Sequence, residues 1–159
     1  MNDGLVRVAD DVRNISHHFH SSILDSLGLV EAIRSECASL SDSARIAVHY
    51  KHKRVPPVVP KEAALCLYRI AQESLRNVAK HAQAANVYVS VAGGDGSLLL
   101  SVRDDGAGFE VAQANRTRGM GLASMEERMQ AIRGELSLES RPGKGTLIEA
   151  RVPLPAGDK

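Results

Sequence analysis

One side of a long helical segment carries a carboxylate, a carboxamide and a cation at regular spacing. Steps of three or four residues separate Ile70, Glu73, Asn77 and then Lys80 or His81. They therefore share a face of a helix, which we expect to differ from the face that packs on the core. Magnesium takes few protein oxygens and keeps several waters, so this face suits a hydrated Mg²⁺ ion and the phosphates it escorts. An ordinary solvent-exposed helix surface has the same pattern, and these residues alone do not distinguish it from a magnesium site.

The sequence RDDGAGF directly follows a predicted strand. An aspartate at a strand end, here Asp104, can accept hydrogen bonds from an amino group such as the one on adenine. Gly106 and Gly108 permit positive φ and a close approach of the backbone to a ligand. Because Asp-Gly is also an ordinary hairpin signal, a simple turn or bulge explains this motif equally well in isolation.

Two further glycine pairs lie near the C-terminal end of the chain. Gly119 and Gly121 precede an amphipathic helix that we expect to begin near Leu122, and free backbone N–H groups at such a start suit phosphate oxygens. The sequence PGKGT places Thr146 after a tight turn, which is also typical of an ordinary hairpin. Each motif is unspecific alone. Their joint order along one chain is much more specific.

The elements that must position these residues follow from the apolar spacing. A short coiled-coil-like stripe, too short to be stable alone, comprises Leu5, Val8, Val12, Ile15 and Phe19. A second helical face, interrupted at Gly28, comprises Ile23, Leu27, Val30, Ile33, Cys37 and Leu40. Helices are also predicted over 61–82 and, with Leu122, Met125, Met129 and Ile132 buried, from about 122 to Gly134.

Strands are predicted where apolar residues alternate with polar ones. The segments are 46–50, a hairpin of 87–91 and 98–102 around GGDG, and a final pair at 136–139 and 146–152. We expect the fold class α+β, a two-layer α/β sandwich in which helices cover one face of a mixed sheet.

Composition narrows the class of protein. The 159 residues suit one domain with a short appendage, and the net charge of +1 provides no field for binding nucleic acid or an anionic membrane surface. Cys37 and Cys66 lack metal-ligand spacing and behave as small hydrophobes, which favours a reducing, cytosolic setting. No apolar run approaches the roughly 20 residues that span a bilayer.

The four motifs in their order resemble one family, the ATPase domain shared by histidine kinases, gyrase-type topoisomerases, heat-shock protein 90 and MutL. YRIAQESLRNVAKHAQA is similar to the asparagine-containing box, VRDDGAGF to the first glycine box, GMGLASMEERM to the second and SRPGKGT to the final turn. Within the family, QESLRNVAKHA and GLASMEER look most like bacterial sensor histidine kinases of the nitrate-sensor or desaturase-sensor type. The resemblance implies ATP and Mg²⁺ as cofactors.

The resemblance also implies roles for single residues. Asn77 would ligate magnesium, and Glu73 matches the acidic position that polarises the attacking group. Asp104 would bind the adenine amino group, and the residues expected around the nucleotide are Lys80 and His81 at the phosphates, Gly106 and Gly108 at the base, Gly119, Gly121 and Leu122 in the lid, and Thr146 near the adenine. Asp105 stands where the family often has Asn, a departure with little consequence expected for adenine binding.

The histidine that such kinases phosphorylate is not evident. The family's phosphoacceptor is followed by an acidic residue, whereas Ser21 follows His20 in the cluster of His17, His18 and His20. Nor do acidic or cysteine ligands at suitable spacing complete a metal site there. We therefore expect residues 1–20 to be the end of a helical dimerisation or linker segment and 21–159 to be the ATP-binding catalytic domain.

The implied partners are absent from the chain. They are the protein's own dimerisation and phosphoacceptor domain, in a homodimeric parent that is either anchored in the inner membrane or free, and the receiver domain of a response regulator. Two other readings stay open. An anti-sigma-factor serine kinase shares the expected fold, and a dimerisation or scaffold module would not need Asn77, Asp104 and the ordered glycines.

Overall fold

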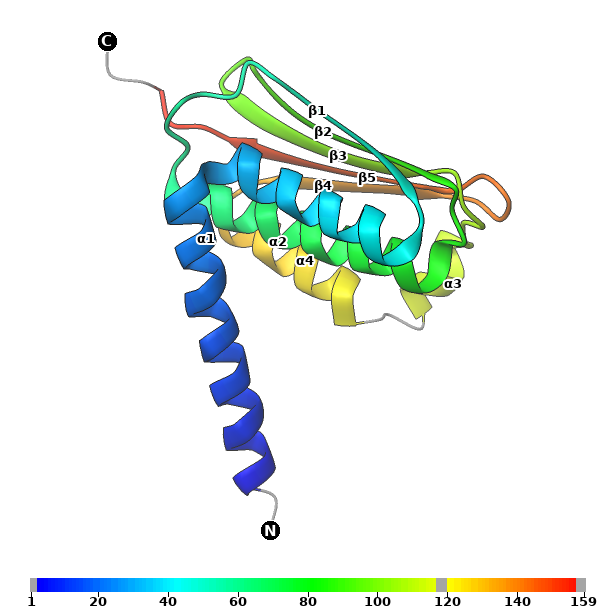
Figure 1. The fold of residues 1–159 in the computed structure, drawn as a ribbon, viewed down its shortest axis with the longest axis horizontal. Coiled ribbons are helices and arrows are strands. Elements are labelled where there is room, and N and C mark those ends of the chain that lie inside the picture. The colour runs from blue at the N-terminus through cyan, green and yellow to red at the C-terminus, as the bar shows by residue number, and fades with distance from the viewer. Residues whose placement is uncertain (1–2, 117–119, 157–159) are drawn as a thin grey trace.

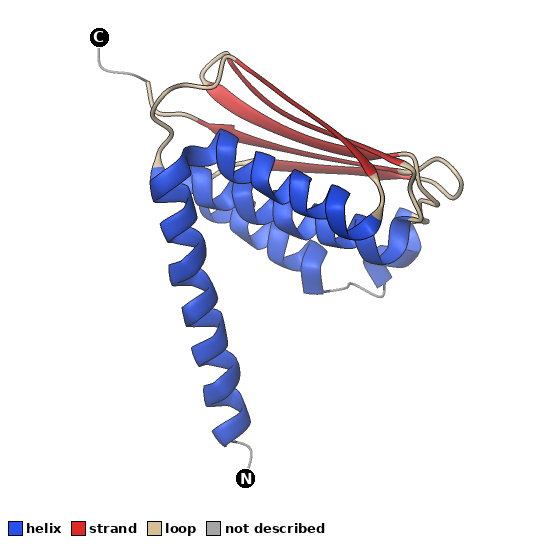
Figure 2. Cartoon of the chain, viewed as in Figure 1, coloured by secondary structure: helices blue, strands red, loops and turns tan. Residues whose placement is uncertain are grey.

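The sheet and the helices form two layers. The computed structural model describes the backbone of residues 3–116 and 120–156 and the side chains of 22–113 and 121–156. Its elements are α1 (Asp3–Ala44), β1 (Ala47–Lys53), α2 (Lys61–Asn77), a π-helix (Val78–Ala82), β2 (Asn86–Gly94), β3 (Ser97–Asp104), α3 (Val111–Arg116), α4 (Met120–Ala131), β4 (Glu135–Ser140) and β5 (Thr146–Pro153). Helices cover one face of the sheet (Figures 1 and 2), which confirms the predicted fold class.

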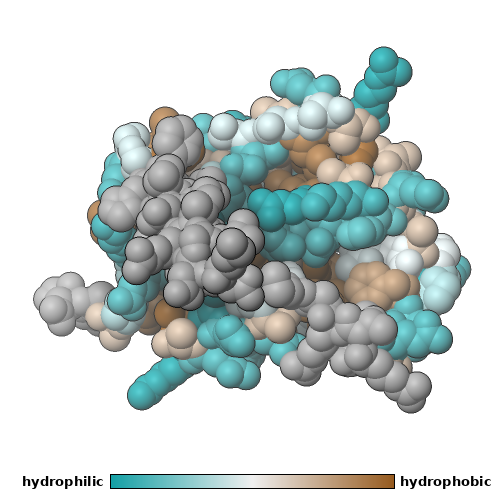
Figure 3. Space-filling model, turned by 90° about the horizontal axis from the view of Figure 1, so that it is seen from below, coloured by the Kyte–Doolittle hydropathy of each residue, from teal (hydrophilic) through white to brown (hydrophobic). Residues whose placement is uncertain are grey.

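The sheet is mixed. Within the described residues its strand order is β1-β2-β3-β5-β4; β1 pairs parallel to β2, and the other pairs are antiparallel. The predicted hairpin is confirmed, with Gly94 opposite Ser97 across the turn. Alternate residues of β2 and β3, such as Val89 and Leu100, are buried, so the period of two dictates which face of the sheet the helices cover. Seen from the helix side, hydrophobic and hydrophilic side chains are mixed over the coloured part of the surface (Figure 3).

Helix α1 has two parts that meet at Gly28. This residue has φ 77 and ψ 168, which is not helical, and Figure 1 shows the N-terminal part projecting away from the rest of the molecule. The second part packs on the body: the Tyr50 hydroxyl donates to the Val30 carbonyl at 2.8 Å, and the Tyr68 hydroxyl donates to the Glu36 carboxylate at 2.6 Å. The predicted stripe from Leu5 to Phe19 and the three histidines near it lie outside the described side chains.

Three details of the predicted helices are wrong. Leu27 is 52% exposed, whereas Leu29 is buried, because the break at Gly28 shifts the helical register that the spacing assumed. The long helix does not run as one α-helix to residue 82, since it changes to a π-helix at Val78. Ile70 is fully buried, so the face that it shares with Glu73 and Asn77 is not separate from the core.

Candidate functional site

A cavity of about 460 Å³ lies between the end of α2, the start of α4 and the inner face of β3, β5 and β4. Its lining combines an apolar wall with a few polar groups, which is the usual character of a small-molecule site. The lining residues are Ser74, Asn77, Val78, His81, Ala82, Val102, Asp104, Gly108, Phe109, Gly121, Leu122, Leu138, Thr146 and Ile148. The fold therefore brings all four sequence motifs to one cavity.

Asp104 is the buried acid of this cavity. It is the last residue of β3, and its inward position follows from the alternation that buries Leu100 and Val102. The side chain is 5% exposed, and its Oδ1 accepts a hydrogen bond from the Gly106 N–H at 2.8 Å. Burial raises the pKa of Asp104, and hydrogen bonds from the Gly106 and Thr146 N–H groups oppose that rise. The result is a hydrogen-bond acceptor held in apolar surroundings.

The glycines of the site make room for other protein segments. A Cβ on Gly106 would overlap the Ala82 carbonyl, and Gly106 is not among the residues that line the cavity. Gly108 lines it with φ +61, and a Cβ there would overlap the Arg141 carbonyl. A Cβ on Gly145, which has φ +74, would overlap the Asp104 carbonyl. The first glycine loop and the final turn are therefore packed backbone to backbone.

Ser140 joins those two segments, and sequence reasoning missed it. Its hydroxyl accepts from the Phe109 N–H at 2.9 Å and lies 2.9 Å from both the Gly145 carbonyl and the Thr146 hydroxyl. The Gly143 N–H donates to the Ala107 carbonyl at 2.6 Å. These bonds hold Thr146 at the edge of the cavity beside Asp104, its partner in the β3–β5 pair. A serine at the end of a predicted strand was the available signal.

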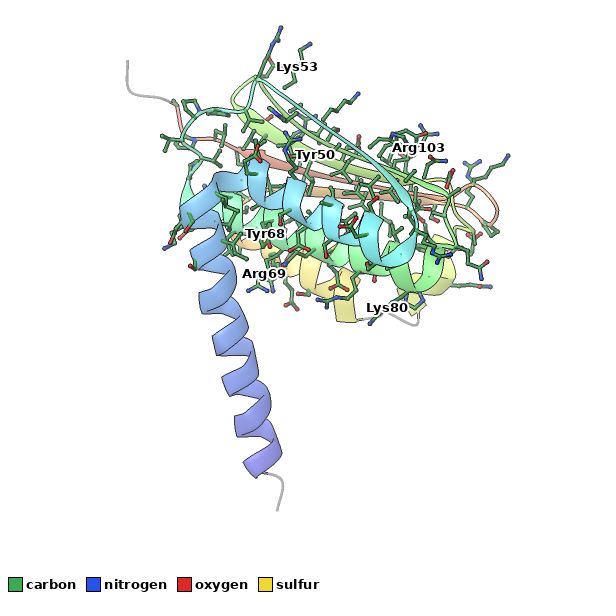
Figure 4. The ribbon with its side chains drawn as sticks, viewed as in Figure 1. Tyr50, Lys53, Tyr68, Arg69, Lys80 and Arg103 are labelled. Carbon is green, nitrogen blue, oxygen red and sulfur yellow. The ribbon has the colours of Figure 1, made fainter. Side chains whose placement is uncertain are left out.

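Asn77, at the end of α2, and His81, in the π-helix that follows, both line the cavity about one turn apart. Lys80 is exposed and is not among the lining residues, and Figure 4 places it on the helix side, away from the sheet. Of the two residues expected at this face, His81 is thus the one that lines the cavity, because the wider π-helical turn sets which of them follows Asn77 on the same side.

The side chain of Glu73, a residue of α2, packs against the start of α4. A Cβ on Gly121 would overlap the Glu73 carboxylate, which places this acid against the backbone of the second glycine box. The Arg76 guanidinium lies 3.4 Å from the same carboxylate. Gly121 and Leu122 line the cavity, whereas Gly119 lies outside the described residues.

A divalent cation would depend on oxygens from a ligand and from water. In the part of the chain that the structure describes, no group of three or more His, Cys, Asp or Glu side chains is placed to hold a metal ion. The carboxamide oxygen of Asn77 is the neutral ligand type that Mg²⁺ accepts while it keeps waters, so this donor set fits Mg²⁺ bound together with phosphates.

None of the described helices is long and apolar enough to cross a bilayer.

Comparison with known sequences agrees with this geometry. The family described as histidine kinase-, DNA gyrase B- and HSP90-like ATPase matches residues 62–156. The chain is 33% identical over 148 residues to the oxygen sensor histidine kinase NreB of Staphylococcus carnosus, which covers 93% of this chain and 43% of that protein. It is 30% identical over 145 residues to the histidine-protein kinase/phosphatase DegS of Brevibacillus brevis, covering 91% and 37%. The chain thus spans less than half the length of either relative.

Solved structures show the same fold. The histidine kinase domain of the blue-light activated kinase from Erythrobacter litoralis EL346 superposes with a TM-score of 0.67 at 23% identity, over 79% of this chain and 61% of that one. The Acinetobacter baumannii histidine kinase AdeS superposes with a TM-score of 0.65 at 14% identity, over 98% and 87%. At these identities the superpositions establish the architecture, while the sequence matches establish kinship.

Proposed function

Since the chain belongs to the histidine kinase-, DNA gyrase B- and HSP90-like ATPase family, we propose that it is the ATP-binding catalytic domain of a sensor histidine kinase. The observation that carries the proposal is the cavity itself, which is lined by both Asp104 and Asn77. A buried acceptor suits the amino group of adenine, and a carboxamide one helical turn from His81 suits Mg²⁺ and the phosphates.

The proposed roles differ in how directly the geometry supports them. Asn77, Asp104, His81 and Thr146 line the cavity, so each can contact a nucleotide without rearrangement. Glu73 lies beside Gly121 at the α4 end, where the phosphates would leave the cavity. In phosphoryl transfer the protein mainly positions the reacting groups and stabilises their charge, so these residues would orient the γ-phosphate towards an acceptor. Magnesium would neutralise the phosphate charge in that reaction.

The acceptor and the other partners belong to this proposal too. We place the phosphorylated histidine on a dimerisation domain outside this chain, with the projecting part of α1 as the connection to it (Figure 1). Residues 1–20 would belong to that connection and 21–159 to the catalytic domain. The receiver domain of a response regulator would take the phosphoryl group in turn. This kinase would act in the cytoplasm as a homodimer.

Calorimetric titration with ADP, with and without Mg²⁺, tests the proposal. We expect the unaltered chain to bind Mg-ADP, and to bind ADP more weakly once EDTA removes the metal. Asn77→Ala should abolish most of that metal dependence. Ser101→Ala, on the open face of the sheet, is the control and should behave as the unaltered chain. A folded chain with no affinity for Mg-ADP would exclude the proposed function.

A further inference from the structure

A buried hydroxyl that has no partner among the described residues borders the cavity. Ser74 is 1% exposed, and its Oγ has no hydrogen-bond partner among the described residues. Asp104 is the other buried polar residue of the described chain, and it too lines the cavity. Ser74 is thus one of very few polar groups that the fold commits to this interior.

The lack of a partner requires an explanation. A serine inside a helix can donate to the carbonyl four residues earlier, but Ser74 makes no such bond with Ile70. A buried hydroxyl left unpaired costs free energy, and alanine at the same place would avoid the cost and favour the helix. Buried polar groups in folded proteins are nearly always paired with protein, water or ligand. The cavity is where a partner for Ser74 can bind.

The side chains of Asp104 and Thr146 do not supply a free hydrogen-bond donor for the ring nitrogens of a purine. The Asp104 side chain, when ionised, can only accept hydrogen bonds, and the Thr146 hydroxyl is already within 2.9 Å of Ser140. A purine carries ring nitrogens that accept hydrogen bonds as well as the amino group that donates. An uncommitted hydroxyl supplies the missing donor.

We propose that Ser74 is a further base-recognition residue, whose hydroxyl donates to a ring nitrogen of the adenine, directly or through one ordered water. This inference rests on the proposed function and deepens it. Ser74 is more buried than Asn77, which follows it by three residues on α2, so it faces the deep end of the cavity where a base lies and not the exit where phosphates lie. Asp104 would then accept a hydrogen bond from the amino group of the base, and Ser74 would donate one to a ring nitrogen.

The first test compares Ser74→Ala with the unaltered chain in Mg-ADP titrations and in thermal unfolding. We expect affinity to fall about tenfold, the effect of one hydrogen bond to a buried group. The unfolding temperature without nucleotide should not fall, because the variant loses only an unpaired hydroxyl. A purely structural serine would give the opposite pair of results. Ser101→Ala is the matched control and should change neither quantity.

The second test identifies the contact on the base. Titrations with 1-deaza-ADP, 3-deaza-ADP and 7-deaza-ADP each remove one of the three ring acceptors of adenine. We expect the unaltered chain to bind one of them about tenfold more weakly than ADP, and Ser74→Ala to show no further loss with that analogue. Ser74→Cys, which keeps a heteroatom at the same position but is a weaker donor, should lie between serine and alanine and guards against a folding defect in the alanine variant.

The outcomes separate the two proposals. If the unaltered chain binds Mg-ADP and Ser74→Ala binds it equally well, the role of Ser74 is excluded while the proposed function stands. The same holds if none of the three deaza analogues binds more weakly than ADP, or if the loss with Ser74→Ala is the same for ADP and for each analogue. If the unaltered chain binds no Mg-ADP, both proposals are excluded.

Discussion

The two adjacent aspartates at the end of β3 belong to different regions of the molecule. Asp104 points into the cavity and is 5% exposed. Asp105 lies on the surface, where its carboxylate accepts hydrogen bonds from the N–H groups of Ala85 and Asn86 and from the Asn86 side chain, each at 2.9 Å. Burial raises the pKa of Asp104, whereas the hydrogen bonds from Asn86 lower the pKa of Asp105.

The difference shows how one residue type serves two purposes within one motif. Successive side chains at a strand end point to opposite sides, so the same carboxylate meets a ligand site in one case and a neighbouring segment in the other. Asp105 fastens the glycine loop to the start of β2, beside the bond from the Asp105 N–H to the Asn86 carbonyl at 3.2 Å. Asp104 is then held at the cavity by a loop that its neighbour fixes.

The largest expected effect is on nucleotide affinity, which should depend on Asp104 and not on Asp105. Asp104→Asn should weaken Mg-ADP binding at least about a hundredfold, because the amide replaces a charged acceptor and can turn a donor towards the base amino group. Asp105→Asn should change the affinity by less than about threefold. Calorimetric titration of both folded variants measures this. Equal losses would mean that the division of roles is wrong.

The next effect concerns the turn that packs on Asp104. Gly145→Ala should destabilise the chain by about 3 kcal/mol, because a Cβ would overlap the Asp104 carbonyl and φ is positive. Gly143→Ala is the matched control, since it has φ +77 but nothing within 4 Å of the added carbon, and should cost only about 1 kcal/mol. Urea unfolding of the two variants checks the difference. Similar costs would show that the contact with Asp104 is not tight.

The opposite pKa shifts predict opposite pH dependences. A raised folded-state pKa means that Asp104 contributes stability at acidic pH, which is lost as the pH rises through that pKa. The lowered pKa of Asp105 means that its contribution is present at neutral pH and is lost as the pH falls. Relative to the matching asparagine variant, the unaltered chain should lose stability as the pH rises above about 4 in the case of Asp104, and should lose stability as the pH falls below about 4 in the case of Asp105. Urea unfolding at intermediate pH values gives both slopes, and slopes of the same sign would contradict the assignment.

The smallest effect is local. Asp105→Ala should lower the unfolding temperature slightly and speed hydrogen exchange at the Ala85 and Asn86 amides, because both lose their acceptor. Asp104→Ala should leave exchange at those two amides unchanged. Exchange measured by NMR on both variants checks this. Fast exchange at Ala85 in both variants would mean that the loop is fixed from the cavity side instead.

Much of the fold could be predicted from local pattern. The alternation in 87–102 specified the hairpin, and the joint order of the four motifs indicated the ATPase fold and half of the residues that line the cavity. Where local geometry changed, prediction failed. Leu27 was grouped with the apolar residues on the other side of Gly28 because spacing does not say how far the break there turns the helix. Lys80 and His81 were left as alternatives because a π-helical turn has no clear signal in the sequence.

Residue types and spacing alone determined which chemistry the chain can perform, since an aspartate after a strand and an asparagine on a helix have the same donors and acceptors wherever they lie. Only the tertiary structure decided what the neighbouring carboxylate, Asp105, bonds to. It also decided that the glycines accommodate backbone and that Ser74 is buried with no partner among the described residues. The physical reason is that burial and hydrogen bonding depend on segments far apart in sequence, so spacing along one element does not contain them.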